Sequence, residues 1–139
     1  MRENITQRLS ARFAAYQDLA EQLEEDLLHK KLELPKHKSL AEHLWCVIGA
    51  RESYTHAIER GAWDGFTCSM QSFAPQDFSH KLSESADTAL RTLDAVTEWT
   101  DERINLLATL AEHEVMHEGQ IIRHMYALGK TLPDSWTWA

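Results

Sequence analysis

Apolar residues recur at steps of three and four along most of this chain, the spacing that places side chains on one face of an α-helix. Ser39 followed by Glu42 forms a capping box at the start of one such segment, and Gly61 ends it. No segment alternates apolar and polar residues long enough to predict a strand. The pattern therefore predicts an all-α fold with four helices, over residues 4–28, 39–60, 79–99 and 101–128.

The segments between these helices suggest how they assemble. Residues 61–78 have no helical period and contain two glycines and one proline, so we expect them to form the longest loop, between helices two and three. Thr100 and Asp101 offer an N-cap to the fourth helix. We expect a four-helix bundle in which the long loop allows helix three to cross the bundle. The 139 residues, 1–139, are expected to form a single domain.

Charge and apolar content narrow the expected partners. Asp and Glu number 22 against 14 Lys and Arg, for a net charge of −8, and such a chain repels a phosphate backbone. The longest apolar stretch, Leu44–Ala50, is too short to span a bilayer, and the first residues lack the apolar core of a signal peptide. We therefore expect a cytoplasmic protein with no nucleic-acid partner and no membrane contact, whose Cys46 and Cys68 are reduced.

Eight histidines are the unusual feature of the composition. His113 and His117 are four residues apart, and so share one helix face, on a stripe that is apolar at both ends. His43 lies between Leu40 and Val47 on the buried side of the second helix. Three imidazoles from two helices would hold a divalent metal ion and leave coordination positions open. Zinc, nickel, iron and manganese all accept such ligands.

Other polar residues of the fourth helix are assigned smaller roles. Gln120 lies on the same stripe, where it would orient a ligand or be a satisfied polar core residue. His124 is about 10 Å along the helix axis from His117, outside a shared coordination sphere. The neighbouring carboxylates are expected mainly on the solvated surface; they are Glu112, Glu114 and Glu118.

His113, Glu114 and His117 also spell H-E-x-x-H, the signature of zinc peptidases in which the glutamate is the general base. Such an enzyme needs a third ligand downstream, but the only acid after Glu118 is Asp134. It also holds an extended substrate against a sheet edge, and no strand is predicted. A peptidase is therefore kept only as an alternative.

Several motifs together resemble the DinB/YfiT-like superfamily. They are His43 on the second helix, the H-x-x-x-H-x-G-Q run from His113 to Gln120, and the G-x-x-x-P turn from Gly129 to Pro133. The resemblance covers essentially the whole chain, although Glu118 stands where the commonest form of the family has arginine. It implies a helical bundle, a divalent metal held by three histidines, and often a homodimer. Characterised members include isomerases and S-transferases that use the thiols bacillithiol or mycothiol.

Two classes of function follow from these residues. The first is a metal-dependent enzyme, a hydrolase or a thiol-dependent transferase or isomerase, acting on a small molecule or a low-molecular-weight thiol. The second is a non-catalytic metal-binding or structural bundle. Because imidazole binds metal only when neutral, metal affinity is expected to fall below about pH 6.

Overall fold

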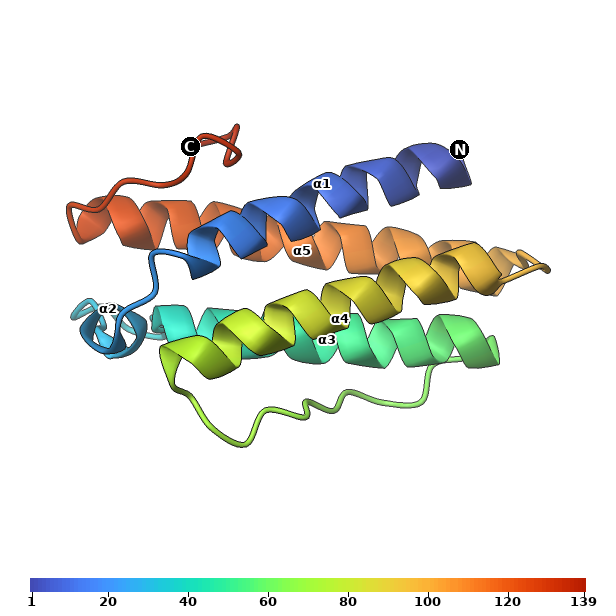
Figure 1. The fold of residues 1–139 in the computed structure, drawn as a ribbon, viewed down its shortest axis with the longest axis horizontal. Helices are drawn as coiled ribbons and strands as arrows, with labels where there is room; N and C mark the ends of the chain where they lie inside the picture. Colours follow the sequence, from blue (N-terminus) through green and yellow to red (C-terminus); the bar gives the residue numbers. More distant parts are fainter.

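The computed structural model describes residues 1–139 and is entirely helical, which confirms the all-α prediction (Figure 1). No helix combines the length and the apolar character needed to cross a lipid bilayer. The helices are α1 (Arg2–Ala20), α2 (Glu25–His29), α3 (Leu40–Arg60), α4 (Pro75–Ala95) and α5 (Asp101–Ala127).

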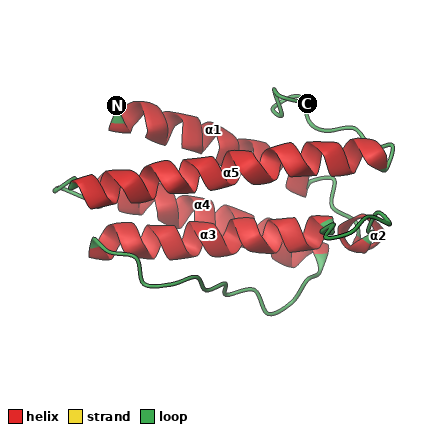
Figure 2. Cartoon of the chain, turned by 180° about the vertical axis from the view of Figure 1, so that it is seen from behind, coloured by secondary structure: helices red, strands yellow, loops and turns green.

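The four long helices lie side by side, and the short α2 lies at one end of them (Figures 1 and 2). Both α1 and α3 pack against α4 and α5. Helices α1 and α3 are therefore diagonal neighbours, as are α4 and α5. In Figure 1, α3 and α4 run in one direction and α1 and α5 in the opposite one. Apolar side chains from all five helices fill the interior.

The connection over residues 62–74 explains why α3 and α4 are parallel. These residues can extend over about 43 Å, whereas α3, with 21 residues, is about 32 Å long. The loop therefore returns along α3, as Figure 1 shows, and the third long helix starts at the end where the second one started. Gly49 admits the loop closely, because a Cβ there would overlap the Phe66 ring. Ser53 holds it by donating to the Thr67 carbonyl and accepting from its N–H, both at 2.9 Å.

The first predicted helix, residues 4–28, is wrong as a continuous element. It divides into α1 and α2, with an extended Glu24 between them. Leu27 and Leu28 of α2 are both buried. The break turns α2 back against α3, so that both leucines join the core.

The remaining boundaries agree more closely with the pattern. The Ser39 capping box is present, with the Ser39 hydroxyl 3.2 Å from the Glu42 N–H. Thr100 caps α5. Helix α4 starts at Pro75, four residues before the predicted start at residue 79 and inside the predicted loop 61–78. Proline suits this position, because the first turn of a helix needs no N–H donor.

Candidate metal centre

Two of the three proposed ligands meet in the interior. His43 on α3 and His117 on α5 are 3% and 2% exposed, and their Nδ1 atoms are 2.9 Å apart. One Nδ1–H can donate to the other Nδ1 when one ring has the opposite tautomer. The fold therefore brings together two imidazoles that are 74 residues apart in the chain.

The third proposed ligand, His113, lies beside this pair. Its ring centroid is 4.5 Å from that of His117, and its Nδ1 is buried without a hydrogen-bond partner. As the side chains lie, no three His, Cys, Asp or Glu residues form a metal-binding group. The proposed three-nitrogen group of His43, His113 and His117 is therefore not formed as the side chains lie.

Burial keeps these imidazoles neutral. Desolvation, with a smaller contribution from the Lys38 ammonium, lowers the pKa of His43 to about 4. Desolvation, with smaller contributions from the neighbouring His113 and His43, lowers the pKa of His117 to about 3. Desolvation is also the main cause that lowers the pKa of His113. The loss of metal affinity, expected below about pH 6 from the sequence, is therefore expected at lower pH, because protons compete with the metal only at and below the folded-state pKa.

Glu114 is not on the surface, contrary to the prediction from its residue type. It is fully buried and accepts from Arg51 on α3 through both oxygens, Oε1 from Nε at 2.6 Å and Oε2 from Nη2 at 3.0 Å. Arg51 is equally buried, donates to the Leu82 carbonyl at 3.0 Å, and lies over the Phe13 ring. This pair connects α3 and α5, the two helices that carry the histidines.

Glu118 is also buried, at 1% exposure, where a surface position was expected. Its Oε1 accepts from Arg12 of α1 at 2.6 Å, and its Oε2 is buried without a partner. Glu118 of α5 is thus paired with an arginine from another helix. Only Glu112 is exposed, as predicted.

These positions argue against a zinc peptidase. In H-E-x-x-H enzymes the glutamate must face a water on the metal. Here both carboxylate oxygens of Glu114 are held by Arg51 in the core. The Glu114 carboxylate is therefore part of a buried ion pair and is not placed to act as a general base.

Gln120 lies elsewhere than its spacing indicated, whereas His124 is buried and outside the proposed ligand set, as predicted. Gln120 is exposed on α5, so it is not a core residue of the stripe. His124 is 1% exposed, and its Nδ1 lies 2.7 Å from Nε2 of His37. The two rings stack at 4.9 Å between centroids. The sequence alone does not reveal that His37 faces His124, because the two residues are 87 positions apart.

No protein-family model matches this chain, and a search of curated proteins likewise found no match.

Proposed function

We propose that the protein is a DinB-type four-helix bundle that binds one divalent metal ion through His43, His113 and His117, and that it acts as a metal-dependent enzyme on a small molecule. The observation that carries the proposal is the buried meeting of His43 and His117, with Nδ1 atoms 2.9 Å apart. Buried imidazoles from two helices, beside a third with an unpartnered nitrogen, are unusual in an apolar core.

The donor set suits such an ion. Two nitrogens bound to one ion at about 2.1 Å lie roughly 3.0–3.4 Å apart, depending on its geometry. The 2.9 Å separation of His43 and His117 is close to this range. The lowered pKa values keep the rings neutral near pH 7, and neutral imidazole is the form that ligates.

The chain's own residues would position the site. Arg51 and Glu114 fix α3 against α5, and so fix His43 relative to His113 and His117. A divalent ion held there supplies Lewis-acid chemistry, which serves either a hydrolase or a thiol-dependent transferase or isomerase. The homodimer, the cytoplasmic location and the thiol substrate stay predictions from the sequence.

A non-catalytic role is supported by the same hydrogen bond. The hydrogen bond between their Nδ1 atoms gives His43 and His117 a polar partner in the core without a metal ion. The two proposals differ in what the purified protein contains.

Metal content is the test. Untagged protein, dialysed against metal-free buffer, is expected to retain about one equivalent of zinc, nickel, iron or manganese by elemental analysis. His117→Ala and His43→Ala are expected to reduce the content more than tenfold, because each removes a buried ligand. His80→Ala is the control, since its side chain is 72% exposed and paired with Glu84, and it should keep the metal. Folded wild-type protein that fails to retain any added metal would support the structural role.

A further inference from the structure

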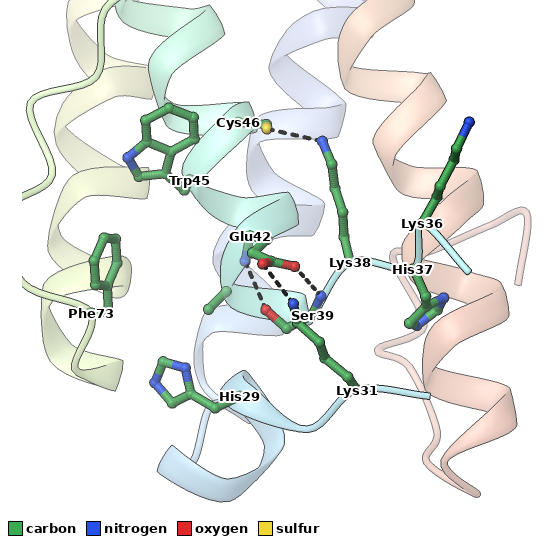
Figure 3. Close-up of a pocket in the computed structure, with 11 residues that line it drawn as sticks. His29, Lys31, Lys36, His37, Lys38, Ser39, Glu42, Trp45, Cys46 and Phe73 are labelled. Carbon is green, nitrogen blue, oxygen red and sulfur yellow. Dashed lines mark hydrogen bonds and ion pairs between the residues drawn. The ribbon is translucent and has the colours of Figure 1, made fainter. Parts of the chain in front are cut away.

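A pocket of about 610 Å³ opens at the end of the long helices where α3 begins. This volume suits a small molecule. Most of its lining comes from the segment between α2 and α3 and from the first two turns of α3, with His29 of α2 and Phe73 of the loop before α4 completing it (Figure 3). Trp45 and Phe73 provide its aromatic wall, and Lys31, Lys36 and Lys38 its cations.

The pocket is lined by more cations than anions, although the chain as a whole is acidic. Four of the six lysines, in a chain with net charge −8, lie within residues 30–38, a cluster that the overall acidity conceals. Glu42 is the one carboxylate that lines the pocket. It is already held by Lys31 at 2.9 Å and by the Ser39 N–H at 2.7 Å. Lys36 and Lys38 have no acidic partner, so their charges are available to a ligand.

Lys38 connects the pocket to the histidines. Its Nζ donates to the Cys46 Sγ at 3.4 Å, and Figure 3 shows its side chain reaching along the first turns of α3. The same ammonium helps to lower the pKa of His43, His113 and His117, so one cation acts on all three rings. His37 lines the pocket as well, and its ring meets His124 of α5 at 2.7 Å.

We propose that this pocket binds a small organic anion, whose charged group pairs with Lys36 and Lys38 and whose flat apolar part contacts Trp45 and Phe73. Such a ligand would lie near the proposed metal site, because Cys46 lines the pocket and is three residues from His43 on α3. The inference that this anion is a substrate rests on the proposed metal site. The inference that the pocket binds the anion does not depend on that site.

The test is a comparison of 2-naphthoate with its neutral isostere 2-naphthamide by isothermal titration calorimetry, with and without added zinc. Naphthoate is expected to bind with one-to-one stoichiometry and at least tenfold more tightly than the amide. Lys38→Met and Lys36→Met are each expected to weaken it about three- to tenfold, which is about 0.7–1.4 kcal/mol. Both lysines are exposed, so these variants should fold normally. Lys30→Met is the control, because it removes the same charge from the same segment without lining the pocket.

Cysteine labelling locates the ligand. Cys46 lines the pocket and Cys68 does not, and both are partly exposed. Bound naphthoate should slow alkylation of Cys46 by iodoacetamide several-fold and leave Cys68 unchanged. Equal affinity for acid and amide, equal loss in Lys30→Met, or unchanged labelling of Cys46 would overturn the proposal. So would displacement of naphthoate by a single-stranded oligonucleotide at physiological salt, which would indicate a phosphate-binding surface.

The two proposals fail separately. Naphthoate binding that survives in His117→Ala protein lacking metal would leave the pocket established without the metal centre. Metal retained at one equivalent with no naphthoate binding would overturn only the anion site.

Discussion

Replacing Glu114 with glutamine is expected to lower the free energy of unfolding by about 3–5 kcal/mol. The carboxylate is fully buried against Arg51, which is itself fully buried, so its loss leaves an uncompensated guanidinium in the core. Urea denaturation of the metal-free protein, followed by circular dichroism, measures the change. The loss of stability should appear whether or not metal is present, because the Arg51–Glu114 ion pair involves protein atoms alone.

Two further variants separate the buried pair from a general effect on α5. Glu112→Gln lies on the same helix but in solvent, and should change stability by less than about 0.5 kcal/mol. The double variant Arg51→Met, Glu114→Leu should recover most of the loss, since a buried ion pair replaced by apolar residues is often neutral or better. A stable Glu114→Gln protein that has lost peptide cleavage would instead restore the peptidase hypothesis.

Acidification from pH 7.5 to pH 5 is expected to destabilise the metal-free protein by about 4 kcal/mol through two histidines, about 2 kcal/mol each. In the unfolded chain histidine protonates near pH 6.5, whereas burial lowers the pKa of His43 to about 4 and of His117 to about 3. The unfolded state therefore binds more protons at pH 5. Stability from the neutral rings is complete above about pH 6.5 and is lost progressively as the pH falls toward the folded values.

Urea denaturation in the presence of a chelator at the two pH values measures this loss. His117→Leu should reduce the pH dependence by about 2 kcal/mol, because one buried neutral ring is gone. His80→Leu, at an exposed position, should leave it unchanged. Identical pH dependence in wild type and His117→Leu would mean that the ring is not held neutral by burial. Bound zinc should persist at pH 5, because the pKa values of His43 and His117, about 4 and about 3, lie below that pH.

Much of the helical structure could be predicted from local patterns. The Ser39 capping box and Gly61 mark α3, and Thr100 marks the start of α5, because these signals act within a few residues. The break between α1 and α2 could not be predicted, since residues 21–24 contain neither glycine nor proline. It is imposed by the packing of α2 on α3, which is a tertiary contact.

The candidate site likewise has residues whose positions local patterns predict and others whose positions they do not. The spacing of His113 and His117 and the stripe around His43 placed all three rings near one another, because both are helix-face patterns. The partners of Glu114 and Glu118 are 63 and 106 residues away, and residue type alone favours the surface for both. A signal was available: both glutamates fall in line with Leu107, Leu110 and Ile121, all buried positions of α5.

The direct test of the metal centre is a crystal structure of the zinc-loaded protein with an anomalous difference map recorded at the zinc edge. We expect one strong peak between α3 and α5, with a nitrogen of His43, His113 and His117 each at about 2.0–2.1 Å from the zinc. A folded protein whose map shows no peak there, or whose zinc lies on His37 and His124 instead, would contradict the proposed metal centre.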